Sequence, residues 1–454
     1  MKCLQGFTGL LRVDILLLPA IIHGLITVTL LFSGDLAIAQ TVADYNIPRI
    51  HSRPNIDGVL AAGEWDQAIR IAVNIETSPA ENMPADVTAE ALIMEDGAVL
   101  YVAFIANDYE IDQIRAFYRD RDDIGRDDRV GIVLDTFNDE RRAYEFFVNP
   151  FGVQADSIFD DVNQRNDDSW NAIWDSAGQI TATGYSVEMA IPLKQLRFTP
   201  SQGLQTWGIN LVRNYPRNRD NRISNTPLDR NISCYLCQIS KADGFANLTI
   251  SRNLEIIPTM TAIAVENRAA AGWDRDGVDP EGSLDVRWGI SQNLYLNATI
   301  NPDFSQVEAD SPQLDINNTF SLFFPERRTF FLDGADYFDS FQNLVHTRNI
   351  ADPRFGAKLT GKSGAHSYGL LAANDTSTSF LIPRSLGSRV ASLADLESEV
   401  AIARYRYDIF ENSTIGALIT DRSGDDYNNR GQSGRRPATH GSRLNFYPEH
   451  GFAV

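Results

Sequence analysis

The chain has 454 residues, enough for two or more domains, and 43% of them are hydrophobic, enough to build packed cores. Its 60 acidic and 40 basic residues give a formal net charge of −20, so nucleic acid is repelled on average and we expect no nucleic-acid partner. This negative net charge is compatible with cations and with neutral polar molecules as ligands.

The first 39 residues have the layout of a secretory signal peptide. Lys2 and Arg12 precede an apolar run over residues 15–32, and the small residues 37–39 precede Gln40. We therefore expect cleavage before Gln40 and export of the rest. Because the apolar run is longer than usual for a signal peptide, an uncleaved membrane anchor is the alternative. No later stretch has about 18 consecutive apolar residues, so we expect no second membrane helix.

Residues 40–250 are predicted to form a β-sandwich of the immunoglobulin or jelly-roll kind. Short segments in which apolar and polar residues alternate are separated by polar turns, which is typical of half-buried strands. The clearest such segments are 87–93, 100–106, 130–134, 144–148, 185–191 and 207–211. We also expect one short helix over residues 61–68 and a helical turn over 192–196.

Residues 251–430 contain longer alternating segments, which predict antiparallel hairpins. Apolar residues recur at every second position over 284–290 and, after a turn at 291–293, over 294–300. Similar pairs occur in 355–372 and 401–419. One apolar and one polar face at this length is typical of transmembrane β-barrel strands that contact outer-membrane lipid. A second soluble β-domain is the alternative.

A membrane barrel must close, because an open edge in lipid leaves backbone groups without partners. Only about five to eight candidate strands follow residue 251, near or below the smallest known barrels. Residues 431–454 lose the alternation and are predicted to be irregular. We therefore expect an all-β chain whose barrel is incomplete and whose tail is truncated.

Two cysteines remain outside the predicted signal peptide, Cys234 and Cys237. In an oxidising periplasm they are expected to form a local disulfide or to remain a free pair. A redox-active pair is the alternative, although the strand-to-helix context of thioredoxin-like sites is missing. Two cysteines alone do not make a structural zinc site.

Several motifs carry a family resemblance. The segment 56–60 with Glu64 and Trp65, and the segment 128–135, resemble carbohydrate-binding module family nine. The rest resembles uncharacterised bacterial outer-membrane proteins in which such a module precedes a barrel-like domain of unknown function; the shared stretches are 147–156, 168–174, 301–310 and 323–337. This resemblance implies a Gram-negative-type outer membrane, with the N-terminal domain in the periplasm.

Family-nine modules hold a sugar between two tryptophans, because an apolar ring stacks on the C–H face of a pyranose. The resemblance implies one tryptophan just before the strand that starts at Asp128 and another in the loop before 245–248. Here residues 124–126 are Ile-Gly-Arg, and Tyr235 is the aromatic residue near the second position. The tryptophan pair is not preserved, which leaves Tyr235 as a candidate ligand contact.

A second aromatic candidate is the Asp-rich loop that carries Trp170 and Trp174. With Asp167 and Asp168 these rings suggest a platform for a polar ligand, and Asp160 with Asp161 suggests a calcium ion held by carboxylates. The alternative is that the tryptophans close one end of the sandwich while the aspartates face water.

Two further motifs are expected to be plain hairpin features. Residues 274–279 resemble half of a calcium loop but lack the terminal Glu, so a polar hairpin loop is expected. Residues 356–363 match the phosphate-binding loop pattern, but alternating segments flank them on both sides. Because that motif requires a helix after the loop, we expect a hairpin and no nucleotide.

No catalytic residue stands out. The six histidines have no metal-ligand spacing, and no Gly-x-Ser-x-Gly motif is present. We favour capture of a saccharide or similar polar ligand by the periplasmic sandwich. A carbohydrate-catabolic hydrolase acting on O-glycosyl compounds is an alternative suggested by family association, since two carboxylates suffice for a glycosidase. A structural or assembly role in the outer membrane without a small ligand is another.

Overall fold

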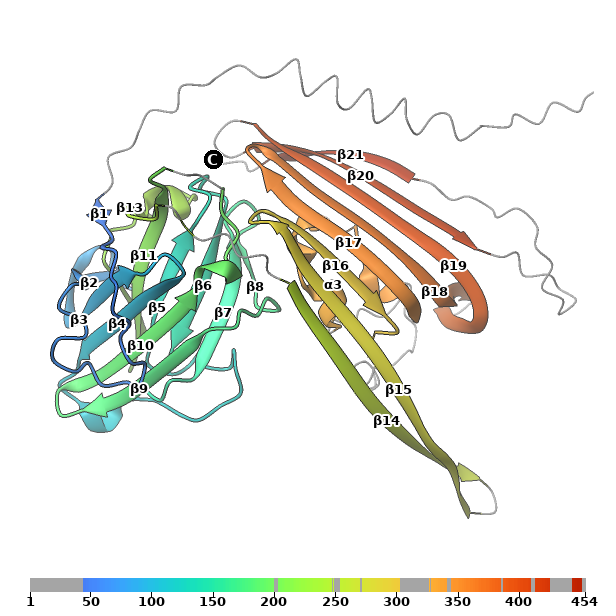
Figure 1. Ribbon diagram of the computed structural model, residues 1–454, viewed down its shortest axis with the longest axis horizontal. Coiled ribbons are helices and arrows are strands. Elements are labelled where there is room, and N and C mark those ends of the chain that lie inside the picture. The colour runs from blue at the N-terminus through green and yellow to red at the C-terminus, as the bar shows by residue number, and fades with distance from the viewer. Residues whose placement is uncertain are drawn as a thin grey trace, which may run out of the picture. The chain divides into compact units, whose positions relative to one another are not determined.

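The computed structural model describes residues 44–199, 203–246, 248, 254–269, 272–302, 326, 328–340, 344–384, 387–409, 413–424 and 443–450. The predicted signal peptide lies outside these residues, as do residues 303–310 and most of 323–327. The strands form a 13-stranded sheet and an 8-stranded sheet (Figure 1). The all-β prediction is confirmed.

The first sheet builds the N-terminal sandwich. Its strand order is β8-β7-β6-β5-β11-β12-β2-β3-β4-β10-β9, and β13 pairs with β11 and β1. The bounds are β1 (Tyr45–Asn46), β2 (Ile69–Ser78), β3 (Met83–Glu95), β4 (Val99–Asn107), β5 (Arg129–Asp135), β6 (Arg142–Val148), β7 (Gln154–Asp160), β8 (Arg165–Asp167), β9 (Asp175–Thr181), β10 (Gly184–Pro192), β11 (Thr206–Pro216), β12 (Asp220–Ser224) and β13 (Ser240–Asp243). All six alternating segments predicted for this region fall in strands.

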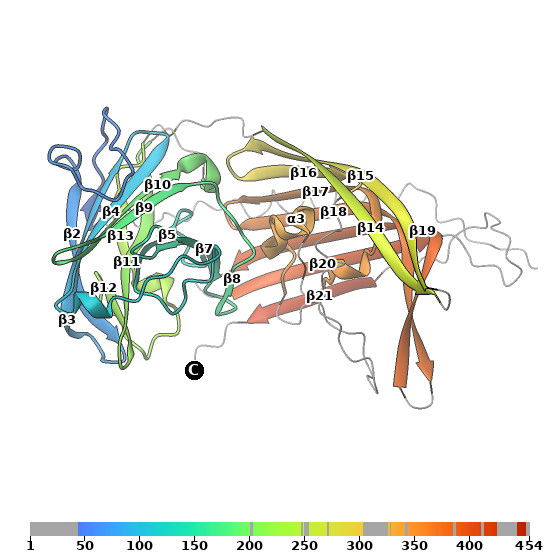
Figure 2. The ribbon, with the colours of Figure 1, turned by 90° about the horizontal axis from the view of Figure 1, so that it is seen from below.

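One core fills the space between the two layers of this sheet. Val130 and Phe146, from β5 and β6, pack in the same apolar cluster as Ala91 and Val187, from β3 and β10. Figure 2 shows the strands of these two layers. The expected helical turn is present as η2 (Leu193–Gln195). The helix predicted over 61–68 is wrong: this segment forms turns, and Gly63 has a φ of 94°, which interrupts a right-handed helix.

A buried carboxylate explains the motif at residues 56–65. The Oε2 atom of Glu188, on β10, accepts the backbone N–H groups of Asp57 at 2.9 Å and Gly58 at 2.7 Å. Its Oε1 atom accepts the indole N–H of Trp65 at 2.8 Å. Gly58 has a φ of 87°, and a Cβ there would lie 2.9 Å from the backbone of Gly178. The motif therefore ties the N-terminal segment to the sheet.

We expect Glu188→Gln to lower the free energy of unfolding by about 1–3 kcal/mol, because its NH₂ group would face a buried N–H donor. Chemical denaturation of the purified chain measures this effect. Glu90→Gln, an exposed replacement on β3, is the matched control. An equal effect of the two replacements would contradict the role given to Glu188.

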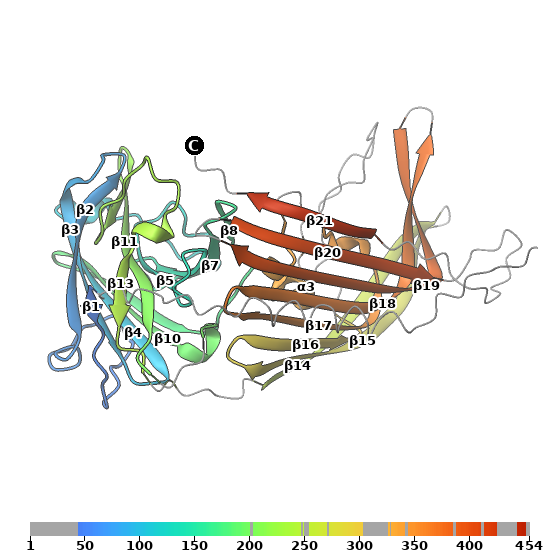
Figure 3. The same ribbon diagram turned by 90° about the horizontal axis from the view of Figure 1, so that it is seen from above.

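The second sheet consists of antiparallel strands in sequence order, each beside the next (Figure 3). Its strands are β14 (Leu254–Ala269), β15 (Gly272–Ser291), β16 (Leu294–Ile300), β17 (Pro353–Ser363), β18 (His366–Arg384), β19 (Gly387–Ile409), β20 (Ser413–Gly424) and β21 (Arg443–His450). Within the described strands, no pairing joins β14 to β21.

The hairpins predicted in this region are confirmed. β15 pairs with β16 in the register Leu284↔Ile300, and β17 pairs with β18 as the alternation at 356–363 suggested. Two expectations are wrong. Residues 274–279 belong to β15 and not to a loop, and residues 443–450, expected to be irregular, form β21. The first residues of β21 do alternate, since Leu444 and Phe446 follow Arg443 and Asn445 in turn, but the segment is too short to stand out in the sequence.

In strands β16 and β17 the two faces of the second sheet invert the pattern of a soluble protein. In β16, Tyr295, Asn297 and Thr299 are buried, whereas Ile300 is exposed. In β17, Lys358 is buried and Phe355 is exposed. The buried face is covered by residues 328–340, which include α3 (Thr329–Leu332) and η4 (Ala335–Tyr337) (Figure 2). In β18, β19 and β20 the covered face also carries apolar residues, since Leu371, Ile402 and Leu418 pack in one cluster with Phe330 and Phe331. No helix among the described residues has the length and apolar character needed to cross a bilayer.

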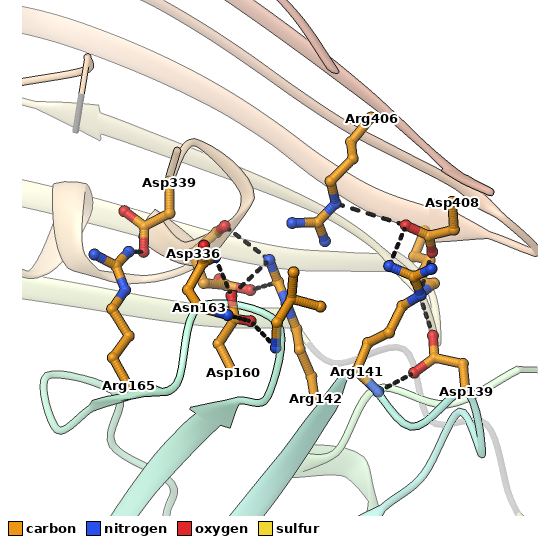
Figure 4. A network of polar contacts seen from close by, with 12 residues as sticks. Asp139, Arg141, Arg142, Asp160, Asn163, Arg165, Asp336, Asp339, Arg406 and Asp408 are labelled. Carbon is orange, nitrogen blue, oxygen red and sulfur yellow. Dashed lines mark hydrogen bonds and ion pairs between the residues drawn. The ribbon is translucent and has the colours of Figure 1, made fainter. Parts of the chain in front are cut away.

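Ion pairs connect the sandwich to the polar side of the second sheet (Figure 4). Arg142 of β6 pairs with Asp336, and Arg165 of β8 pairs with Asp339. The Nη1 atom of Arg141 lies 3.4 Å from Oδ1 of Asp408 on β19. Charged side chains are therefore paired with opposite charges where these elements meet, as burial of charge requires.

Candidate functional site

A cleft of about 520 Å³ lies on the face of the sandwich sheet that points away from the main core. Strands β2, β5, β6, β7, β8, β11 and β12 contribute to it, together with the loop before β5 and the loop after β12. This volume falls in the range of small-molecule sites. Its lining includes Asp122, Gly125, Arg129, Glu145, Phe147, Asp156, Phe159, Asn166, Asp168, Asn214, Arg222 and Tyr235.

Strand β6 shows why the cleft forms where it does. Successive side chains of a strand point to opposite faces. Tyr144 and Phe146 point into the main core, so Glu145 and Phe147 point into the cleft. The same alternation that builds the core therefore supplies a carboxylate and an aromatic ring to the opposite face.

Aromatic rings supply apolar surface to the cleft. The guanidinium carbon of Arg129 lies 5.2 Å from the centroid of the Phe147 ring. The rings of Phe159 and Tyr235 meet edge to face with centroids 5.6 Å apart. The Tyr235 hydroxyl accepts hydrogen bonds from Asn210 Nδ2 at 2.6 Å and Arg222 Nη2 at 3.0 Å. Tyr235 is therefore held in one position.

Fixed polar groups lie beside these rings. The Oε2 atom of Glu145 accepts the hydroxyl of Ser157 at 2.8 Å and the side-chain amide of Asn166 at 2.7 Å. Burial raises the pKa values of Asp122 and Asp156 above their ordinary range. Apolar ring surface next to positioned hydrogen-bonding groups is suited to a hydroxyl-rich molecule.

Of the residues that the sequence suggested for ligand binding, the structure places two at the cleft and two in the core. Asp168 and Tyr235 line the cleft together. Trp170 and Trp174 do not form an exposed platform, since they are only 7% and 5% exposed. The Trp170 ring lies 4.9 Å from that of Tyr144, and the Trp174 ring lies 5.2 Å from that of Phe146. Both tryptophans therefore pack in the core, the arrangement given above as the alternative.

Asp167 and the two aspartates proposed for calcium have other partners. Asp167 accepts the backbone N–H and the hydroxyl of Ser169. Asp160 accepts the backbone N–H groups of residues 162 and 163. Burial opposes its ionisation, but the guanidinium groups of Arg142 and Arg406 hold its pKa below the ordinary value. Asp161 accepts the backbone N–H of Tyr235 at 3.0 Å.

These contacts lend no support to the calcium site suggested for Asp160 and Asp161. The Nη2 atom of Arg142 lies 4.0 Å from Oδ2 of Asp160, and both oxygens of Asp160 accept hydrogen bonds. No cluster of three His, Cys, Asp or Glu side chains suited to a metal ion occurs in the part of the chain that the structure describes.

The loop that carries Tyr235 is closed by a disulfide between Cys234 and Cys237. The backbone N–H of Cys237 also contacts Cys234 Sγ at 3.2 Å, and Gln238 Nε2 donates to the Cys234 carbonyl at 2.9 Å. These contacts restrict the loop, which helps to fix Tyr235 at the cleft.

Sequence reasoning missed most of the cleft. Glu145, Phe147 and Phe159 were not singled out, although the alternation within 144–148 already assigned Glu145 and Phe147 to the face opposite the core. Arg129 and Arg222 carry no comparable signal. They reach the cleft through pairing of β5 with β11 and of β11 with β12, which alternation within one strand does not reveal.

Comparisons with known proteins agree with this division of the chain. Residues 56–226 match the family described as carbohydrate family 9 binding domain-like. Residues 252–365 match a domain of unknown function, DUF5916. No curated protein matches the chain. The chain therefore carries a family-nine-like carbohydrate-binding domain, followed by a segment of the second family.

Two solved structures resemble the chain distantly. One is a family 9 carbohydrate-binding module from Caldicellulosiruptor kristjanssonii in complex with cellotriose, with 18% identity, a TM-score of 0.33, and coverage of 44% of this chain and 94% of that one. The other is a protein from Bacteroides uniformis ATCC 8492 proposed to bind carbohydrate, with 12% identity, a TM-score of 0.36, and coverage of 44% and 98%.

Residues at or near the two positions at which the family resemblance placed its tryptophans line the same cleft. Gly125, at the first position, comes from the loop before β5, and Tyr235, near the second position, comes from the loop after β12. The first position thus lacks an aromatic ring, and a tyrosine lies near the second. Phe147 and Phe159 provide ring surface between them.

We expect Trp170→Ala to lower the free energy of unfolding by about 3–5 kcal/mol, because it opens a cavity beside Tyr144 and Phe146. Thermal or chemical denaturation measures this effect. Ile173→Ala is the matched control, since Ile173 is 70% exposed. A Trp170→Ala protein of unchanged stability would contradict the packing role.

Proposed function

We propose that this chain is an exported outer-membrane protein whose periplasmic sandwich captures a saccharide or a similar neutral polar ligand in the cleft. The observation that carries the proposal is the convergence of Gly125 and Tyr235 on one cleft with half-buried aromatic rings, since these residues lie at and near the two positions where the family resemblance placed its tryptophans. The match of residues 56–226 to a carbohydrate-binding family supports the same ligand class.

The hydrogen-bonding groups of the cleft suit hydroxyl recognition. A sugar hydroxyl both donates and accepts, so it pairs with carboxylates as well as with amides and guanidinium groups. Glu145 offers acceptor oxygens, whereas Asn166 and Arg222 offer donors. The Phe147 ring offers a face for C–H groups. No covalent step is part of this proposal.

We expect Glu145→Gln to weaken saccharide binding about tenfold, because a neutral amide replaces a charged acceptor. Calorimetric titration of the full chain with cellotriose, xylotriose and maltotriose measures the affinity. Glu110→Gln, an exposed replacement outside the cleft, should leave the affinity unchanged. Flat heats for all three sugars with the unmodified protein would refute saccharide capture.

The second sheet supports the proposed membrane location. Its outward face carries an apolar groove of about 380 Å³ lined by Leu296, Ala357, Leu359, Leu370, Ala372, Ala401, Ala403 and Ile419, among others. Leu370 is 48% exposed and Ile415 is 52% exposed. Apolar residues outside and polar residues inside is the order expected of strands that contact lipid. We propose that this face contacts the outer membrane.

We expect Leu370→Arg to reduce the fraction of protein recovered with outer membranes, because a charge at the lipid face costs about 2–4 kcal/mol near the bilayer midplane. Fractionation of Gram-negative cells that express the full chain measures this. Ser363→Arg, exposed at the end of β17, is the control. Recovery of the unmodified chain only from the periplasmic extract would refute the membrane location and leave the cleft proposal standing.

A further inference from the structure

Two stacked aromatic rings, one exposed and one half-buried, lie on neighbouring loops of the sandwich. Tyr118, in the loop before β5, is 82% exposed, and its ring stacks on Phe151 of the β6–β7 turn with centroids 4.8 Å apart and planes inclined by 11°. Phe117 is 54% exposed, and Arg119 lies over its ring at 5.0 Å. We name Phe117, Tyr118 and Phe151 the aromatic ledge.

A buried side chain holds the two halves of the ledge together. Asn149 is fully buried, and its Oδ1 atom accepts the backbone N–H groups of Phe151 and Val153, both at 3.0 Å. Its Nδ2 atom donates to the carbonyl of Phe117 at 2.9 Å and to Oδ2 of Asp127 at 3.0 Å. One amide group therefore links the β6–β7 turn to the loop that carries Phe117 and Tyr118.

Arg121 fixes the same loop to β7. Its Nε donates to Oδ1 of Asp156 at 2.9 Å, its Nη1 to Gln154 at 2.8 Å and its Nη2 to the carbonyl of Ala172 at 2.7 Å. Asp122, the next residue, accepts the backbone N–H of Asp156 at 3.0 Å. The ledge thus keeps its shape without a ligand, which reduces the entropy lost on binding.

The same contacts join the loops of the ledge to the lining of the cleft. Asp122 and Asp156 both line the cleft, and Arg121 and Asp122 hydrogen-bond to Asp156. Tyr118 precedes Asp122 by four residues, and Phe151 lies in the turn that follows Phe147, another lining residue. The loops that carry the stacked rings therefore adjoin residues that line one end of the cleft.

We propose that the aromatic ledge is a second saccharide subsite, which binds the units of a linear oligosaccharide that extend beyond the cleft. This inference rests on the proposed function of the cleft and specifies its ligand as a chain. The flat, open ring of Tyr118 suits the C–H face of a pyranose. The neighbouring Arg119 and Asp123 side chains offer polar partners for the hydroxyl groups at the ring's edge.

Chain length provides the test. The full protein is titrated with matched trisaccharides and hexasaccharides of the cello, xylo and malto series. For a series that binds, the hexasaccharide should bind about threefold to tenfold more tightly than the trisaccharide. Tyr118→Ala should abolish this gain and leave trisaccharide affinity unchanged, whereas Tyr118→Phe, which keeps the ring, should retain it.

Tyr109→Ala is the matched control, because Tyr109 is 85% exposed and lies outside the ledge. It should leave both affinities unchanged. Equal affinities for the two lengths, or a length gain that survives Tyr118→Ala, would overturn the ledge and leave the cleft proposal intact. Loss of trisaccharide binding in Tyr118→Ala would overturn the ledge as a separate subsite. Absence of binding to every sugar would overturn both proposals.

Discussion

In each strand of this chain, successive side chains point to opposite faces, and the surroundings of those faces give the two sheets their different properties. In β6 the side chains of Tyr144 and Phe146 fill the sandwich core, which leaves Glu145 and Phe147 for the cleft. In β17 the order is reversed, because the buried face carries Lys358 and the open face carries Phe355. The first arrangement gives a core with a polar cleft behind it. The second gives a sheet with an apolar exterior.

The motifs of the sandwich are explained chiefly by buried polar groups. Glu188 binds the N-terminal segment through two backbone amides and Trp65, and Asn149 closes the β6–β7 turn. Asp156 accepts the backbone N–H of Ala172 at 2.6 Å, which fixes the segment between Trp170 and Trp174. A buried backbone N–H group without a hydrogen-bond acceptor at any of these places would lower the stability of the fold, so these side chains determine the local structure. The motifs that these side chains belong to are therefore explained by the fold, without reference to a ligand.

The contrast between local patterns and contacts between distant residues explains how far the sequence could predict the fold and the site. The strands of the sandwich and the hairpins of the second sheet follow from alternation, which is a local property. The helix expected over 61–68 failed because Trp65 is held by a distant glutamate and Gly63 interrupts the helical backbone. For the site, the sequence suggested Asp168 and Tyr235 as separate candidates and gave no sign that they line one cleft, and Arg129 and Arg222 reach it only through strand pairing. Trp170 and Trp174 left two alternatives open, because four-residue spacing is common to core packing and to ligand platforms, and the structure shows the packing.

The charge balance of the cleft bears on its ligand. Asp122, Glu145, Asp156 and Asp168 line it, and so do Arg129 and Arg222. Arg121 pairs with Asp156 at 2.5 Å, and burial raises the pKa values of Asp122 and Asp156, so protonation would remove charge from the cleft more readily than in water. The strong negative charge of the whole chain is therefore only weakly expressed at this place. A neutral hydroxyl-rich molecule can donate to the carboxylates and accept from the arginines of the cleft while the ion pair between Arg121 and Asp156 stays in place.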